Sequence, residues 1–142
     1  GLRTLLLTCP RPVLAVPGDP SALSKALLAY DGSPKAEEAL FVAAYLAGRW
    51  QTSLVVLTVA EGRPTLPAQA HARDYLESQD VAAEYLLEEG PVARTIQDVA
   101  GQRGCDLVLM GGYGHSPVVE VVVGSAVDSL LRESRTPVLI CR

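Results

Sequence analysis

Residues 106–125 read DLVLMGGYGHSPVVEVVVGS, which combines an apolar run with closely spaced glycines. The run DLVLM predicts a short buried strand. Gly111, Gly112 and Gly114 follow at its end. Glycine at a strand end lets the backbone approach a ligand closely and turn its N–H groups toward an anion. We therefore expect ligand contact where this strand ends.

A second glycine motif, Gly124-Ser125, opens a helix that we predict over Ser125–Glu133. The free N–H groups and the dipole at a helix N-terminus favour phosphate. Ser125 offers its hydroxyl either to cap the helix or to donate to a phosphate oxygen. A strand-end glycine alone is more often an ordinary turn, but the whole combination predicts an anion site.

Residues 25–34, KALLAYDGSP, repeat the order of strand, turn and helix nearer the N-terminus. We predict a buried strand over Lys25–Asp31, with Ser33 as the N-cap and Pro34 as the first residue of a helix. This helix is expected to end near Gly48.

The rest of the chain continues the alternation of strands and helices. Because the strands are mostly continuous apolar runs, we expect an α/β fold with a doubly wound, open, parallel five-stranded sheet that is covered on both faces. With right-handed crossovers, the expected strand order is 3-2-1-4-5. The other predicted elements are strands at residues 53–59, 83–88, 106–110 and 137–141, and helices around residues 75–76 and over 91–103.

The first residues are similar in sequence to the end of the chain. Leu5-Leu6 and Pro12-Val13-Leu14 have the same spacing as Leu130-Leu131 and Pro137-Val138-Leu139. We interpret residues 1–17 as the last helix and strand of a preceding like domain, 18–24 as a linker and 25–142 as the complete domain. A chance match between two helix-to-strand connections is the alternative.

The last strand is wholly apolar and would lie at a sheet edge, where unprotected strands are normally paired. We therefore expect residues 13–16 to add an antiparallel strand beside residues 138–141, within one chain or exchanged between two.

Composition excludes several classes of protein. The chain has 142 residues, enough for one domain. Its net charge is −4 and its lysines are Lys25 and Lys35 alone, and this shortage of positive charge argues against nucleic-acid binding. No apolar stretch approaches the roughly 20 residues of a membrane span. Cys9, Cys105 and Cys141 lack metal-ligand spacing, so we expect no metal site and reduced thiols in the cytoplasm.

Asp31 ends the first predicted strand of the sheet as Gly111 ends the fourth. In an open α/β sheet, ligands bind beyond the carboxyl ends of strands where the strand order reverses, which here lies between these two strands. A carboxylate there accepts hydrogen bonds from ribose hydroxyls or an adenine amine. An Asx-turn or a helix-capping role before Pro34 is an equally good reading of Asp31 alone.

These motifs resemble the universal stress protein domain. The resemblance rests on DGSP at residues 31–34, Thr58-Val59, Met110-Gly111 and the pattern G-x2-G-x9-G-S, and it covers the chain from about Ser24 to its end. It implies binding of ATP or a related adenine nucleotide, with or without Mg²⁺, and a second such domain, in tandem or as a dimer, paired through Val138–Cys141.

The resemblance also implies a role for each matched residue. The adenosine end would contact Ala29, Tyr30, Asp31 and Val59. The ribose and first phosphates would contact Met110, Gly111 and Gly114, and the phosphate chain would contact His115, Gly124, Ser125 and Ala126. Members of the family often carry Lys or Arg between the second and third glycines, whereas this chain has His115 and Glu120 there. The missing cation should weaken a triphosphate more than a monophosphate.

We therefore expect a nucleotide-binding regulatory module of a stress-response protein rather than an enzyme. A slow nucleotide hydrolase is a competing hypothesis, although the chain has no G-x-x-x-x-G-K-[ST] loop and no Ser-His-Asp set. Two more hypotheses are a phosphorylatable receiver-like switch with Asp31 as acceptor, and a nucleotide-free dimerisation domain.

Overall fold

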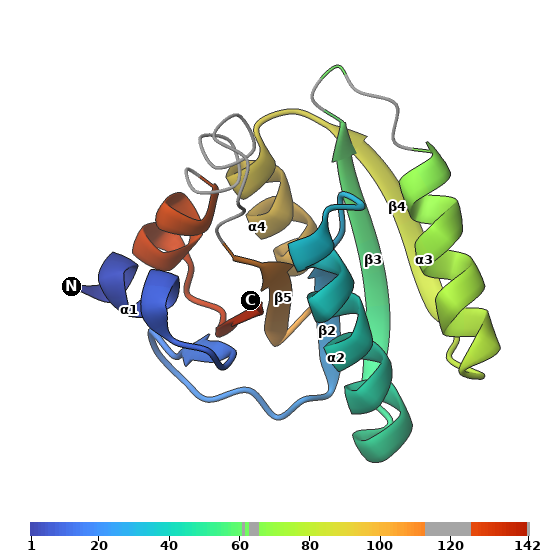
Figure 1. Ribbon diagram of the computed structural model, residues 1–142, viewed down its shortest axis with the longest axis horizontal. Helices are drawn as coiled ribbons and strands as arrows, with labels where there is room; N and C mark the ends of the chain where they lie inside the picture. Colours follow the sequence, from blue (N-terminus) through green and yellow to red (C-terminus); the bar gives the residue numbers. More distant parts are fainter. Residues whose placement is uncertain (61, 63–65, 113–125, 142) are drawn as a thin grey trace.

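One mixed sheet organises the chain (Figure 1). The computed structural model describes residues 1–60, 62, 66–112 and 126–141. Within these residues the strand order is β1-β6-β5-β2-β3-β4, and every neighbouring pair is parallel except β1 with β6. The predicted order and the antiparallel edge strand are confirmed. The strands are β1 (Val13–Ala15), β2 (Lys25–Ala29), β3 (Ser53–Ala60), β4 (Ala83–Glu89), β5 (Leu107–Gly111) and β6 (Val138–Cys141).

Helices cover both faces of the sheet. α2 (Pro34–Trp50) and α3 (Leu66–Ser78) pack on one face, where they share a core with β2 and β3. On the other face lie α4 (Val92–Arg103), α1 (Leu2–Thr8) and a C-terminal helix over residues 126–133. In Figure 1, α1 lies beside this C-terminal helix. The doubly wound architecture predicted from the apolar strands is thus confirmed.

The strands are continuously apolar because each one contributes to two cores. In β3, Leu54 and Val56 belong to the core under α2 and α3, whereas Val55 and Leu57 belong to the core under α4. All four side chains are almost completely buried. A parallel strand between two helical layers has no solvent-facing side, so the polar alternation of a half-exposed strand is absent.

Two element boundaries differ from the prediction by two residues, and several others by one. α2 continues past Gly48 to Trp50 and ends at Gln51, which has the left-handed φ of 57°. The extra residues bring the Trp50 ring to 5.7 Å from the ring of Tyr45. β2 ends at Ala29 rather than Asp31. The chain leaves the ladder there because it must turn into α2, and Asp31 lies just beyond the strand.

The edge of the sheet is closed from within the chain. Val13, Leu14 and Ala15 of β1 pair with Ile140, Leu139 and Val138 of β6, respectively. β6 is almost entirely buried. The expected pairing of the N-terminal segment with the last strand is therefore confirmed, and it forms in cis.

Candidate functional site

The candidate site lies at the carboxyl ends of β2 and β5. These strands are direct neighbours, and Ala29 at the end of β2 pairs with Met110 of β5. From this pair the sheet continues through β3 and β4 on one side and through β6 on the other. The strand order reverses here, which is where open α/β sheets bind ligands.

The turn after β2 is built by two local hydrogen bonds and a glycine with positive φ. Asp31 Oδ1 accepts a hydrogen bond from Ser33 N at 2.9 Å, and Ser33 Oγ accepts one from Ala36 N at 3.2 Å. Gly32 has a φ of +80°, and a Cβ there would lie 3.1 Å from the Cβ of Ala68. The Asx-turn and the predicted N-cap are therefore both present. Asp31 is exposed, and its Oδ2 has no partner among the described residues.

Gly111 is required for helix packing. A Cβ on this residue would lie 2.6 Å from the carbonyl carbon of Lys35 and 2.7 Å from Ala36 N. Both are backbone atoms in the first turn of α2, so no side-chain rotation relieves the clash. The sequence suggested ligand contact for Gly111, but its immediate neighbour in the structure is the start of α2.

Ala29, Val59 and Met110 form an apolar surface at the carboxyl ends of three adjacent strands. All three belong to the core on the α4 face. Met110 is buried, whereas Ala29 and Val59 are partly exposed. The structure thus brings together three of the residues expected around the nucleoside.

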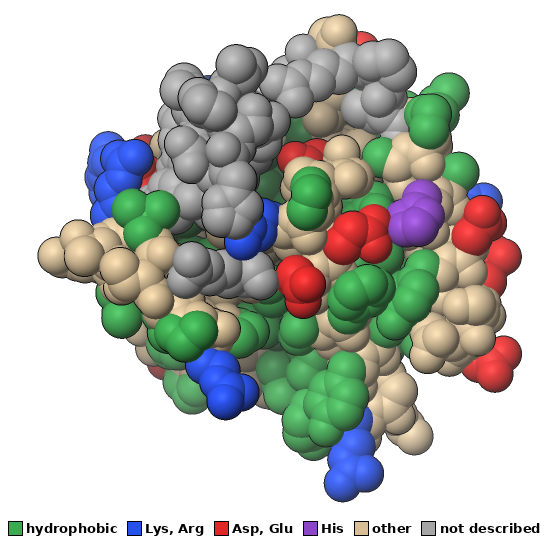
Figure 2. Space-filling model, viewed as in Figure 1, with side chains coloured by type: hydrophobic (Ala, Val, Ile, Leu, Met, Phe, Trp, Pro, Cys, Tyr) green, Lys and Arg blue, Asp and Glu red, His purple; other side chains and the backbone are tan. Residues whose placement is uncertain are grey.

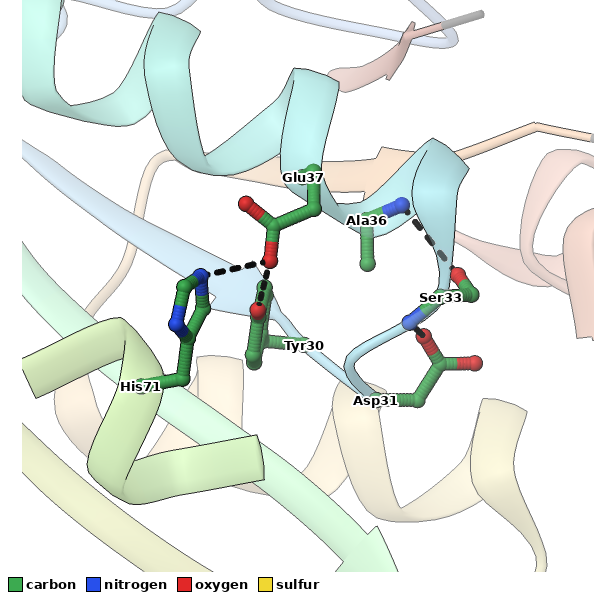
Figure 3. A network of polar contacts seen from close by, with 6 residues as sticks. All are labelled: Tyr30, Asp31, Ser33, Ala36, Glu37 and His71. Atoms are coloured by element: carbon green, nitrogen blue, oxygen red, sulfur yellow. Dashed lines mark hydrogen bonds and ion pairs between the residues drawn. The ribbon is translucent and has the colours of Figure 1, made fainter. Parts of the chain in front are cut away.

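Tyr30 is held by contacts inside the protein. Its side chain is 2% exposed, its hydroxyl donates to Glu37 Oε1, and its N–H donates to Leu57 O at 2.9 Å. His71 Nε2 from α3 lies 3.0 Å from the same Glu37 oxygen, and Figure 3 shows the three side chains together. Burial and the bond to Glu37 raise the pKa of Tyr30 above its usual range. The phenol therefore ties the residue after β2 to α2, and its hydroxyl is occupied by Glu37 within the protein.

Four of the expected site residues, Gly114, His115, Gly124 and Ser125, lie outside the described residues. Ala126, the last of the expected phosphate contacts, belongs to the C-terminal helix and is 5% exposed. The described part of the site therefore comprises the β2 turn, the end of β5 and the apolar surface between them.

Two polar side chains near the site were missed by the sequence interpretation. Lys35 lies in the first turn of α2 directly against Gly111. Thr58, near the end of β3, is completely buried, and its hydroxyl has no partner in the described part of the chain. Thr58 entered the sequence analysis only as part of the family pattern and Lys35 not as a site residue, because the positions of both depend on contacts between elements that are distant along the chain.

Metal-binding side chains do not gather in the described ranges: no group of three or more His, Cys, Asp or Glu residues is positioned to hold an ion there. Figure 2 shows acidic side chains and a histidine near the first turns of α2 and α3. The ordered polar contacts among them are those of Tyr30, Glu37 and His71.

Comparison with known proteins supports one family. The model of the universal stress protein family matches residues 23–77 and 65–142. Universal stress protein Slr1230 of Synechocystis is 29% identical over 144 residues, which cover 99% of this chain and 50% of that protein. The chain thus spans about half the length of this curated relative.

Solved structures show the same fold. A universal stress protein of Archaeoglobus fulgidus has a TM-score of 0.79 at 22% identity, and the match covers 92% of this chain and 49% of that protein's chain. A universal stress protein in complex with cAMP has a TM-score of 0.70 at 22% identity and covers 84% of this chain and 96% of its own. A further one from Archaeoglobus fulgidus, in complex with dAMP, has a TM-score of 0.66 at 18% identity and covers 83% and 97%. By its family match and its fold, this chain belongs to the universal stress protein family.

Proposed function

We propose that this domain binds an adenine nucleotide, ATP or a close relative, and acts as a regulatory module rather than as a catalyst. The observation that carries the proposal is the arrangement at the end of β2 and β5. Asp31 is an exposed carboxylate with one unused oxygen, and it lies where the strand order reverses, next to the apolar surface formed by Ala29, Val59 and Met110. An apolar surface suits a base, and a carboxylate suits ribose hydroxyls.

The complexes of two relatives with cAMP and dAMP support this ligand class. Both ligands share the adenine base and a ribose-type sugar with phosphate. Because those proteins are distant in sequence, they support the class of ligand and leave the number of phosphates to be measured.

Binding without turnover is the simplest reading of Asp31. Its Oδ1 accepts a hydrogen bond from Ser33 N in its own turn, which leaves Oδ2 to accept further hydrogen bonds. Among the described residues, no neighbouring side chain is placed to make Asp31 act as a general base. The sequence carries no phosphate-binding lysine loop of the hydrolase type. We therefore assign Asp31 to the nucleoside and to no chemical step.

Titration calorimetry with adenosine, AMP and ATP tests the proposal. Asp31→Asn should lower the affinity for all three by about 1–3 kcal/mol, the range for a lost charged hydrogen bond. Asp19→Asn, the same charge change at an exposed linker residue, is the matched control and should leave affinity unchanged. Gly114→Val should block binding without unfolding the sheet. Robust release of ADP over hours, abolished in Asp31→Asn with binding retained, would favour the hydrolase.

We also propose that α1 and β1 are the end of a preceding domain of the same fold. Residues 1–16 align without a gap with residues 126–141, and each segment contains a helix followed by a strand after the same interval. Under this match Leu14 corresponds to Leu139, and these two residues pair directly. On either side, Val13 pairs with Ile140, and their counterparts Val138 and Ala15 also pair with each other. This symmetric pairing describes a local two-fold axis between Leu14 and Leu139.

Two further observations fit this axis. Arg3 corresponds to Asp128, and Arg3 Nη1 lies 3.7 Å from Asp128 Oδ2. Leu5 is 49% exposed, whereas its counterpart Leu130 is completely buried. Leu5 therefore has the pattern of a core residue whose own core is missing from this domain.

A longer chain tests this organisation. Placing residues 18–125 ahead of Gly1 would supply α1 and β1 with a complete like domain. We expect amide exchange in α1 to slow by at least about tenfold, and Leu5→Asp to abolish the slowing. Exchange in α1 that is unchanged in the longer chain would contradict the proposal.

We further propose a cytoplasmic location. Cys105 and Cys141 are buried thiols without a disulfide, as expected in a reducing compartment. Separately, none of the helices in the described residues has the length and apolarity needed to cross a bilayer. Fractionation of cells that express the tagged protein would test this location. Titration of the thiols in the recovered protein would show whether its cysteines are reduced.

A further inference from the structure

Lys35 occupies a distinctive position at the candidate site. A Cβ on Gly111 would lie 2.8 Å from the Cβ of Lys35, so the lysine side chain begins directly against the end of β5. This is the carboxyl end of the adjacent parallel strands β2 and β5, the same end of the sheet at which Asp31 lies. From there its flexible four-carbon stem can direct the ammonium over the strand ends.

The charge of Lys35 is not used within the described residues. The ion pairs found there join Arg3 to Asp128, His71 to Glu37, Arg94 to Asp98 and Arg103 to Glu84. Lys35 takes part in none of them, although it is only partly exposed. Glu37, two residues further along α2, is already engaged by Tyr30 and His71.

Lys35 is also an unfavourable choice for its local position. It is the second residue of the 17-residue helix α2. The positive end of the helix dipole disfavours a cation in the first turn, where Asp and Glu are the stabilising residues. Glu37 in the same turn offsets part of this cost, but the Lys35 charge itself contributes nothing favourable to the helix dipole.

The glycine-rich segment lacks the charge that Lys35 could supply. No Lys or Arg occurs between Gly111 and Arg132, and Glu120 and Asp128 add negative charge there. The sequence of that segment therefore offers no cation to a nucleotide phosphate. A cation from another element would add a charge-assisted hydrogen bond, which is stronger than a bond from a neutral donor.

We propose that Lys35 contacts the phosphate of the bound nucleotide and replaces the cation that the glycine-rich segment lacks. This inference rests on the proposed nucleotide site and assigns its preference for phosphorylated over unphosphorylated ligands to one side chain. Lys35 is thus a specificity residue, which favours ATP and AMP over adenosine.

The two lysines of the chain provide a matched experiment. Lys35 lies at the carboxyl end of the sheet, whereas Lys25 begins β2 at the opposite end. Binding of ATP and adenosine is measured by calorimetry for the unmodified chain and for Lys35→Met, Lys35→Arg and Lys25→Met. Thermal unfolding of each variant monitors the fold.

Lys35→Met should weaken ATP binding about tenfold or more and leave adenosine binding within about twofold, as expected for loss of one charge-assisted contact. Lys35→Arg should recover most of the ATP affinity, and Lys25→Met should bind both ligands normally. Unchanged ATP binding by Lys35→Met, or an equal loss of ATP and adenosine, would overturn the inference while the nucleotide site stands. If the unmodified chain binds neither ligand, the proposed function itself is wrong.

Discussion

Acidic residues at the two ends of the sheet make different hydrogen bonds. At the amino end, Asp106 before β5 accepts hydrogen bonds from Ser24 N at 3.0 Å and Lys25 N at 3.2 Å, through both of its oxygens. At the carboxyl end, Asp31 accepts from Ser33 N, two residues away. Asp106 therefore joins β5 to β2 across more than 80 residues of sequence, whereas Asp31 shapes its own turn and keeps one oxygen available.

Two buried threonines near the two ends of β3 show the same difference between a satisfied and an unsatisfied polar group. Thr52, just before β3, is 3% exposed and donates to Leu23 O at 2.7 Å. Thr58, near the end of β3, is completely buried without a partner among the described residues. Thr52 is thus satisfied within the protein and Thr58 is not. Two other buried side-chain atoms without a partner in the described ranges, Tyr85 Oη and Gln97 Nε2, lie in the middle of β4 and α4, so the contrast holds for these two threonines alone.

Gly111→Ala should give the largest effect, because it forces the carboxyl end apart. The added Cβ would lie within 2.8 Å of backbone and Cβ atoms of Lys35 and Ala36. We expect a loss of about 3 kcal/mol or more in the free energy of unfolding, measured by urea titration. Gly112→Ala is the milder comparison, since its Cβ would lie 3.1 Å from Ile140 Cγ2 and 3.2 Å from Cys141 O, both outside the range of a severe clash. Equal stability of the two variants would mean that α2 moves freely at this end.

Asp106→Ala and Asp31→Ala compare the two acids directly. Asp106→Ala removes the acceptor of two long-range backbone N–H groups and should cost about 2–3 kcal/mol of stability. Asp31→Ala should cost about 0.5 kcal/mol, because the side chain is exposed and its contact is local. Chemical unfolding of both variants without nucleotide decides the point. A larger loss for Asp31→Ala would assign a structural role to the carboxyl end as well.

Thr52→Val and Thr58→Val sharpen the comparison at the smallest scale. Thr52→Val leaves Leu23 O without its donor and should cost about 1 kcal/mol. Thr58→Val removes a buried hydroxyl that has no partner in the described part of the chain and should be neutral or stabilising by up to about 1 kcal/mol. Thermal unfolding at equal ionic strength measures both changes. Destabilisation by Thr58→Val equal to that of Thr52→Val would indicate that the Thr58 hydroxyl is satisfied in solution.

Much of the fold could be predicted because its signals are local. The apolar runs predicted the parallel strands, and the wholly apolar residues 137–141 predicted that this edge would be paired. Ser33 and Pro34 predicted the start of α2, which the N-cap bond to Ala36 N confirms. The end of α2 was wrong by two residues, since Gly48 is tolerated inside a helix that continues to Trp50.

The candidate site was less predictable from sequence. Asp31 was identified, but its local pattern fitted a turn and a ligand contact equally well, and the structure contains the turn. Gly111 was assigned to a ligand from its place at a strand end, although its closest neighbour is the backbone of α2. Lys35 carried no motif at all.

The sequence by itself determined the alternation of strands and helices, the strand order and the glycine spacing of the family, because periodicity, caps and turn residues act over a few positions. Only the tertiary structure decided which polar groups keep unused hydrogen-bonding capacity. Asp106 is satisfied by residues more than 80 positions away, and Lys35 lies against Gly111 because the crossover brings α2 onto β5. Such contacts depend on how the layers pack, and no local pattern encodes them.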